Sequence, residues 1–213
     1  MDEMQVKQAM IDVGKRLDEK NLLVGTGGNF SVRLSADEVL ITASGFCKSM
    51  LKPEHITKVD MHGHIISGLK PARDIRMHLA VYQMKPQARA IVHTHPPVVT
   101  GFAISPYKWD GVALSEVLLD LGSVVVADFA VPTTQQVPQA IEEALRRSES
   151  AKAVILTGHG ALTYSEKDIW DACFNMEVLE MVAKSHLVAH LMGGVRSLSP
   201  EQLSQIQAVN DLT

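Results

Sequence analysis

The sequence has little of what marks several classes of protein. Only two cysteines, Cys47 and Cys173, occur in 213 residues, too few for a disulfide scaffold and in keeping with reduced thiols. No uninterrupted apolar run approaches the ~20 residues that cross a bilayer. The first residues are charged and helix-like, unlike a signal sequence. We therefore expect a cytoplasmic protein.

Neither positive nor negative charge predominates in the sequence. The formal net charge is −4, and no run of five Lys or Arg occurs. This balance argues against a nucleic-acid or membrane-surface partner, while leaving room for a local basic pocket that binds a small anion. The hydrophobic content of 46% is that of an ordinary globular protein, and no repeat or linker divides the chain. Residues 1–213 are therefore expected to form a single domain.

Hydrophobic periodicity predicts interleaved helices and strands. Helical periods occur at residues 4–19, from about Asp74 to Gln83, and at 137–147. A long helix is predicted from Ser165 to about Met192, capped at its start by the Ser165-x-x-Asp168 pattern. Strands are predicted at 30–34, 38–42, 88–95, 123–131 and 152–157, with a hairpin at 59–66. Strands joined by short hairpins favour an α/β domain with a mixed or mainly antiparallel sheet.

The strongest chemical signal is the His93-Thr94-His95 triplet at the end of an apolar strand. Positions i and i+2 of a strand face the same side, so both imidazoles project together, about 6 to 7 Å apart. Neutral imidazole is a common ligand of zinc, manganese and iron. Taken alone, the pair is equally compatible with two histidines on a solvated strand face.

A third histidine strengthens the metal hypothesis. His159 lies between two glycines at the end of another apolar strand, where functional groups often gather. A catalytic metal typically has three protein ligands and one open position. Asp74 opens the helix that leads into the His93 strand. Its carboxylate is either a helix N-cap, or a fourth ligand or proton-transfer group beside the metal. His78, one turn further on, is interpreted as a structural residue.

Two glycine-rich loops suggest a site for an anion. They are Gly25–Asn29 and Ala43-Ser44-Gly45. Backbone N–H groups in such loops, with Asn29 and the Ser44 hydroxyl, can hold a phosphate without a nearby lysine. Ordinary turns use the same residues, so each loop alone is a weak motif.

These motifs together resemble the class II aldolase/adducin family. The matching segments are Gly25–Arg33 (GTGGNFSVR), Ile41–Gly45 (ITASG), Val92–Pro97 (VHTHPP) and Gly158–Gly160 (GHG), in the family's order and approximate spacing. The resemblance covers essentially the whole chain. Members of the family include L-fuculose-1-phosphate aldolase, L-ribulose-5-phosphate 4-epimerase, methylthioribulose-1-phosphate dehydratase and several decarboxylases.

The resemblance implies a fold, an assembly and a set of site residues. The fold is a three-layer α/β/α domain around a largely antiparallel sheet, and the assembly is a homotetramer with active sites at the subunit interfaces. One divalent metal per subunit, zinc in preference to manganese, would bind His93, His95 and His159. The catalytic carboxylate falls on Asp74. The phosphate-binding positions of the family fall on Gly28, Asn29, Ser44 and Gly45.

The sequence departs from the phosphate-sugar members at two places. Two serines that help to bind the phosphate are replaced here by Ala72 and Arg73. The Arg73 guanidinium either binds a phosphate or carboxylate in their place or faces solvent. Fuculose aldolase also supplies a tyrosine acid, and no tyrosine stands at the matching stretch near Leu114, with Tyr107 the nearest one.

The resemblance therefore implies a metal-dependent lyase of carbohydrate metabolism. We expect aldol cleavage of a small ketose 1-phosphate to dihydroxyacetone phosphate and an aldehyde, through a metal-stabilised enediolate. One alternative is decarboxylation of a hydroxy or keto acid whose carboxylate pairs with Arg73. Another is a pentulose-phosphate 4-epimerase, supported only by the Asp at position 74. A non-enzyme alternative is an assembly module like the adducin head.

Overall fold

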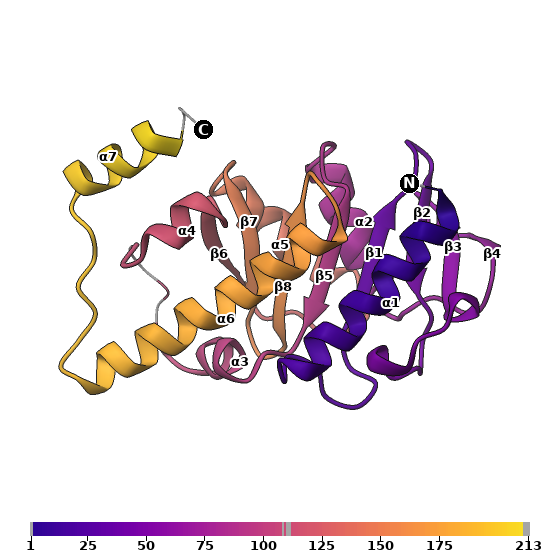
Figure 1. The fold of residues 1–213 in the computed structure, drawn as a ribbon, viewed down its shortest axis with the longest axis horizontal. Helices are drawn as coiled ribbons and strands as arrows, with labels where there is room; N and C mark the ends of the chain where they lie inside the picture. Colours follow the sequence, from indigo (N-terminus) through magenta and orange to yellow (C-terminus); the bar gives the residue numbers. More distant parts are fainter. Residues whose placement is uncertain (1, 108, 110–111, 211–213) are drawn as a thin grey trace.

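A single twisted sheet forms the centre of the computed structural model, which describes residues 2–107, 109 and 112–210 (Figure 1). Its strands are β1 (Asn29–Arg33), β2 (Glu38–Thr42), β3 (Ile56–Asp60), β4 (Ile65–Ser67), β5 (Ala90–Thr94), β6 (Ser123–Ala127), β7 (Ala151–Leu156) and β8 (Gly160–Ser165). The eight strands lie in the order β4-β3-β2-β1-β5-β8-β7-β6. Neighbouring strands are antiparallel except β6 and β7, which are parallel. The predicted largely antiparallel sheet is confirmed.

Helices cover both faces of this sheet. The helices are α1 (Glu3–Glu19), α2 (Ile75–Met84), α3 (Pro97–Ile104), α4 (Ser115–Leu119), α5 (Gln136–Arg146), α6 (Ile169–Leu191) and α7 (Pro200–Asn210). Two short 3₁₀ turns, Lys48–Met50 and Pro53–His55, precede β3. In Figure 1, α1, α3 and α6 lie in front of the sheet, whereas α2 and α5 lie behind it. This arrangement is the predicted three-layer α/β/α architecture.

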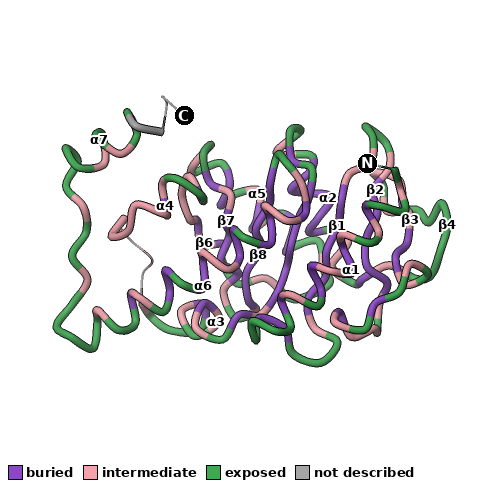
Figure 2. Tube along the Cα trace, in the orientation of Figure 1, coloured by how far each residue is buried: buried purple, intermediate pink, exposed green. Residues whose placement is uncertain are grey.

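Two hydrophobic cores, one on each face, hold the layers together. Phe30 and Leu40 point from the sheet into the core shared with α1 and α6. Val39 and Ile41 point the opposite way, into the core shared with α2 and α5. Side chains alternate between the faces of a strand, so a strand buried on both faces is apolar at nearly every position. Figure 2 shows the central strands buried along most of their length.

The prediction for the start of α6 was wrong. Ser165 belongs to β8, which is buried throughout and pairs with both β5 and β7. The N-cap of α6 is instead Asp168, whose carboxylate accepts a hydrogen bond from the Asp171 backbone N–H at 2.9 Å. Because β8 is held by partners distant in the sequence, the local Ser-x-x-Asp pattern could not reveal where the strand ends and the helix begins.

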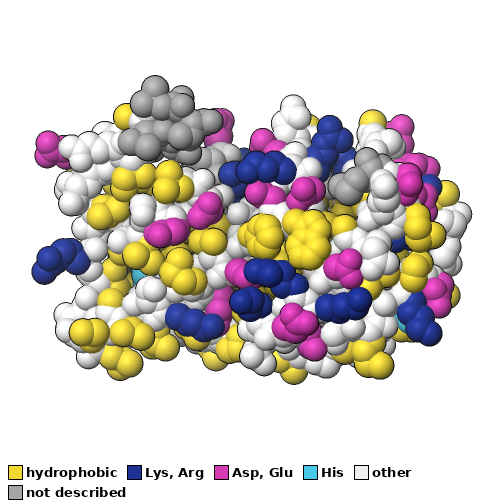
Figure 3. Space-filling model, viewed as in Figure 1, with side chains coloured by type: hydrophobic (Ala, Val, Ile, Leu, Met, Phe, Trp, Pro, Cys, Tyr) yellow, Lys and Arg dark blue, Asp and Glu magenta, His cyan; other side chains and the backbone are white. Residues whose placement is uncertain are grey.

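The surface carries charges of both signs. In Figure 3, Lys and Arg side chains are interspersed with Asp and Glu over the face formed by α1 and α6. Within the described part of the chain, no helix combines the length and apolar character needed to cross a membrane.

Gly14 permits α1 to lie directly on the turn that begins at Lys48. A Cβ atom at position 14 would lie 2.1 Å from the Lys48 carbonyl oxygen. We predict that Gly14→Ala lowers the free energy of unfolding by about 1–3 kcal/mol, although alanine favours helix by about 1 kcal/mol. Gly101 in α3 is a matched control, since no described residue of the chain lies within 4 Å of its added Cβ. Gly101→Ala should raise stability by about 0.5–1 kcal/mol. Urea denaturation measures both; equal stabilisation would contradict the packing argument.

Candidate metal centre

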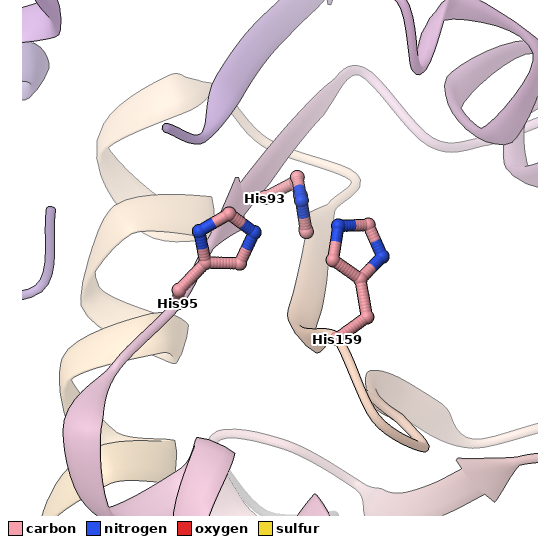
Figure 4. A group of neighbouring side chains, drawn as sticks. All are labelled: His93, His95 and His159. Carbon is pink, nitrogen blue, oxygen red and sulfur yellow. The ribbon is translucent and has the colours of Figure 1, made fainter. Parts of the chain in front are cut away.

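Three histidines converge at one end of the central strands. His93 is the fourth residue of β5, His95 follows the end of β5, and His159 lies in the turn between β7 and β8. The pairing of β5 with β8 sets Thr94 opposite Ala161, which brings the His159 turn alongside the end of β5. Figure 4 shows the three rings turned toward one another. Their centroids are 4.8 to 5.1 Å apart, and their candidate ligand atoms all lie within 4.8 Å of one another.

The His93 ring is oriented by the backbone. Its Nδ1 lies 2.8 Å from the Ala161 carbonyl oxygen, which can only accept, so Nδ1 carries the proton. Burial lowers the pKa of His93 well below its usual value, and the neighbouring His159 and His95 lower it further. The ring is therefore neutral, and its Nε2 carries a lone pair. A metal-binding histidine is commonly held in this way, by a hydrogen bond from its other nitrogen.

His95 is held between glycines. Added Cβ atoms would lie 3.0 Å from its Nδ1 at Gly27 and 2.6 Å from its Cδ2 at Gly160. Larger residues at either position would therefore collide with the ring or displace it. Burial lowers the pKa of His95, and His159 adds to this effect, while the Asp74 carboxylate opposes it.

The donor set fits a cation. The Nε2 atoms of both His93 and His95 are buried and have no hydrogen-bond partner among the described residues. Leaving a buried polar nitrogen unpaired costs about 1–3 kcal/mol. A divalent ion shared by the three rings would satisfy these atoms, and three neutral imidazoles are a usual ligand set of zinc.

A buried glutamate fixes the chain just after His95. The Glu180 carboxylate on α6 accepts hydrogen bonds from the backbone N–H groups of Val98 and Val99, at 3.2 and 3.0 Å. These N–H groups belong to the first turn of α3, where helical partners are missing and the helix dipole favours negative charge. Sequence reasoning missed Glu180. The available signal was an acidic residue within the otherwise apolar Leu179–Val182 stretch of a long helix.

Asp74 occupies the N-cap position of α2 but does not cap the helix. Its side chain makes no capping hydrogen bond. Instead, one carboxylate oxygen accepts a hydrogen bond from the Asn29 Nδ2 at 2.8 Å. Because the carboxylate is not engaged by the helix terminus, it remains beside the histidine group, where its charge acts on His95.

A chain of buried hydrogen bonds holds the Asn29 side chain in place. Because the Asn29 amide N–H group donates to Asp74, its carbonyl oxygen must accept, and the His78 Nε2 donates to it at 2.5 Å. The Ser31 hydroxyl then donates to His78 Nδ1 at 2.7 Å, and the Tyr82 hydroxyl donates to Ser31 at 2.9 Å. Burial lowers the pKa of His78 to about 4, which keeps the ring neutral. His78 therefore lies outside the three-histidine group and serves the support of Asn29.

The glycine-rich loops meet at the start of α2. Gly28 has φ +74° and lies so close to β5 that an added Cβ would be 2.8 Å from the His93 carbonyl oxygen. The Ser44 N–H donates to the Lys70 carbonyl at 2.9 Å, so the Ser44–Gly45 loop lies beside the segment that leads to Asp74. Arg73 is exposed next to Asp74. The structure thus gathers these predicted positions around the first residues of α2.

A buried lysine, which no sequence pattern places here, lies between the two loops. The Lys48 ammonium donates hydrogen bonds to the carbonyl oxygens of Thr26 at 2.9 Å and Phe46 at 2.6 Å. Lys48 is only 2% exposed. In the sequence it looks like any surface lysine, and no local signal marks it as buried.

Comparison with known proteins identifies the family. A family model described as "Class II Aldolase and Adducin N-terminal domain" matches residues 8–187. The chain is 31% identical over 194 residues to a 3-oxo-tetronate 4-phosphate decarboxylase of Haemophilus influenzae, covering 86% of this chain and 88% of the relative. It is 34% identical over 181 residues to a methylthioribulose-1-phosphate dehydratase of Methylococcus capsulatus, covering 80% and 87% of the two chains.

A solved structure supports the same assignment. The structure of an L-fuculose 1-phosphate aldolase superposes with a TM-score of 0.89 at 28% sequence identity, covering 99% of this chain and 98% of that chain. The matched relatives and this structure are enzymes that carry out different reactions. The predicted family is confirmed: the chain belongs to the class II aldolase and adducin family and is one of its enzymes.

Proposed function

We propose that the protein is a metal-dependent carbon–carbon lyase whose cation is held by His93, His95 and His159. The observation that carries this proposal is the pair of buried Nε2 atoms, on His93 and His95, that lack any other partner in the described residues. Zinc suits three imidazole ligands best, and manganese is the second choice. A bound divalent cation would act as a Lewis acid on a substrate oxygen that gains negative charge.

The protein's own residues would move the proton. We assign this role to Asp74, whose carboxylate is held beside the histidines by Asn29 rather than by the helix terminus. In aldol cleavage, Asp74 would accept the proton of the hydroxyl whose carbon becomes the aldehyde as the carbon–carbon bond breaks. It would return a proton to the enolate carbon left behind. The hydrogen-bonded chain behind Asn29 fixes the carboxylate before substrate binds, and such preorganisation favours the transition state.

The first candidate reaction is cleavage of a small ketose 1-phosphate to dihydroxyacetone phosphate and an aldehyde. We assign the phosphate to the loops that carry Gly28, Asn29, Ser44 and Gly45, which lie beside the start of α2. The similarity to an L-fuculose 1-phosphate aldolase over nearly the whole chain supports this reaction.

The second candidate is decarboxylation of a keto or hydroxy acid. Where a ketone lies β to the carboxylate, loss of carbon dioxide also leaves an enolate that must be protonated, so the same site could serve either reaction. Arg73 is exposed next to Asp74, where its guanidinium could bind a substrate carboxylate in a forked geometry. The similarity to a 3-oxo-tetronate 4-phosphate decarboxylase supports this alternative.

Measuring metal content together with kcat should distinguish the metal ligands from the residue that transfers the proton. His95→Ala should reduce bound metal from roughly one equivalent to about a tenth or less, because three ligands become two. Asp74→Asn should keep the metal but lower kcat by about 10²- to 10⁴-fold, the usual effect of losing a general acid–base group. Elemental analysis and a coupled assay for dihydroxyacetone phosphate measure the two effects.

His64→Ala is the matched control for this experiment. His64 has a side chain that is 79% exposed on the β3–β4 hairpin, so its loss should change neither metal content nor rate. Retention of a full equivalent of metal by His95→Ala would contradict the proposed centre.

Arg73→Ser should distinguish the two reactions. If Arg73 binds a carboxylate, its loss should raise KM for the acid by about tenfold or more, because a charge-assisted hydrogen bond is lost. If the protein is an aldolase, the variant should cleave the ketose phosphate at least as well as the wild type, since serine is what the phosphate-sugar members carry. Release of carbon dioxide and formation of dihydroxyacetone phosphate are measured across one substrate panel. Arg76→Ser is the control, because Arg76 is an exposed arginine in the first turn of α2, close to Arg73 in the sequence.

We further propose that the protein is a homotetramer. Four exposed apolar side chains cluster at the end of α6: Leu187, Val188, Leu191 and Met192. A groove of about 630 Å³ lies beside them and is lined by Phe102, Tyr107 and other mainly apolar residues of α3 and α6. Exposed apolar surface of this kind marks an interface.

The molar mass in solution tests the assembly. Leu191 is 79% exposed, so a charge there would be harmless in a monomer but buried in an interface. Leu191→Glu should therefore reduce the mass from four subunits to fewer by light scattering. Met4→Glu, a similar change at an exposed position of α1, should not. A monomeric wild type would overturn the proposal.

A further inference from the structure

The position of Lys48 is unusual for a lysine. Its backbone is pressed against α1, where only glycine at position 14 leaves room for the Lys48 carbonyl. Its side chain runs inward and ends between two loops, donating to the Thr26 carbonyl in one and to the Phe46 carbonyl beyond the other. Lys48 thus joins the two glycine-rich segments, although they are separated by β1 and β2 in the sequence.

Within the described chain, no counter-ion is bonded directly to the Lys48 ammonium. Both of its hydrogen-bond acceptors are neutral carbonyl oxygens, and no described carboxylate forms an ion pair with it. An ammonium group has three N–H donors, so one of them has no acceptor among these residues. Buried charges are usually paired, because removing an ion from water without compensation is costly. Burial accordingly lowers the pKa of Lys48, against the opposing effects of Cys47 and Asp74.

This charge lies at the candidate site rather than in a distant core. Thr26, one of its partners, immediately precedes Gly27, which packs against the His95 ring. Phe46, the other partner, immediately follows Gly45. The Asp74 carboxylate is also near enough to act on the Lys48 charge. The ammonium therefore lies between the two segments to which we assign the phosphate.

We propose that Lys48 is a phosphate-binding determinant: its ammonium is the fixed positive charge of the anion site, and the phosphate dianion of the substrate is its counter-ion. The inference rests on the proposed function, which assigns these loops to the phosphate. It also accounts for the departure at Ala72, because a buried cation can replace the attraction that a lost hydroxyl supplied. The hydrogen bonds to Thr26 and Phe46 hold the two loops at the spacing that the anion requires.

The test compares variants that separate charge from hydrogen bonding. Lys48→Gln keeps an N–H donor for the loop carbonyls but removes the charge, whereas Lys48→Arg keeps the charge. The matched control is Lys52→Gln, since Lys52 is an exposed lysine in the same segment. Binding of inorganic phosphate to the metal-loaded protein is measured by calorimetry, and turnover of ketose phosphates is measured separately.

We expect Lys48→Gln to weaken phosphate binding by about tenfold or more, the loss of one charge-assisted interaction. Its KM for the phosphorylated substrate should rise in parallel while its metal content stays unchanged. Lys48→Arg should bind phosphate within about threefold of wild type, and Lys52→Gln should bind it as the wild type does. If Lys48→Gln does not fold, Lys48→Arg carries the test, and a tenfold loss there would overturn the proposal.

Two outcomes separate this inference from the proposed function. Equal phosphate affinity in wild type and Lys48→Gln overturns the role of Lys48, even if ketose phosphates are cleaved. Lys48-dependent phosphate binding without turnover of any ketose phosphate supports the inference and overturns the proposed reaction. A wild type that binds no phosphate overturns the role of Lys48 as well.

Discussion

The antiparallel pairing of β5 with β8 sets the spacing of the histidines, and the rest of the site is arranged around it. Backbone hydrogen bonds fix the register, which places Thr94 opposite Ala161 and the His159 turn beside the end of β5. The Ala161 carbonyl, positioned by the same pairing, then orients the His93 ring. A shift of one residue would turn every side chain of β8 to the opposite face, so the register is strongly constrained by the two cores.

Buried polar groups around the site fix the orientation of side chains through hydrogen bonds, which hydrophobic packing cannot do. The chain from Tyr82 through Ser31 and His78 to Asn29 has one consistent direction of donors and acceptors, and it ends on the Asp74 carboxylate. Each buried member has a partner, so the chain avoids the penalty of an unpaired polar group. It fixes one orientation of the carboxylate in advance of any substrate.

Two buried charged residues, Glu180 and Lys48, bind backbone groups near the site, and Glu180 also pairs with Lys184 at 3.5 Å. Glu180 accepts from the first N–H groups of α3, and Lys48 donates to carbonyls in the segments around the two glycine-rich loops. Backbone N–H and C=O groups outside helices and strands need other partners, and charged side chains bind them strongly. These hydrogen bonds tie the segments near the histidines to α6 and to the turn that begins at Lys48.

The sequence by itself determined the family, the layered fold with its largely antiparallel sheet, and the three-histidine hypothesis, because periodicity and short motifs are local properties of the chain. Tertiary structure alone decided that β8 exists and ends at Ser165, since its hydrogen bonds go to distant strands. It also decided that Asp74 contacts Asn29 instead of capping α2, and that Lys48 is buried. These facts depend on which side chains meet across the fold, and no pattern of neighbours along the chain encodes that directly.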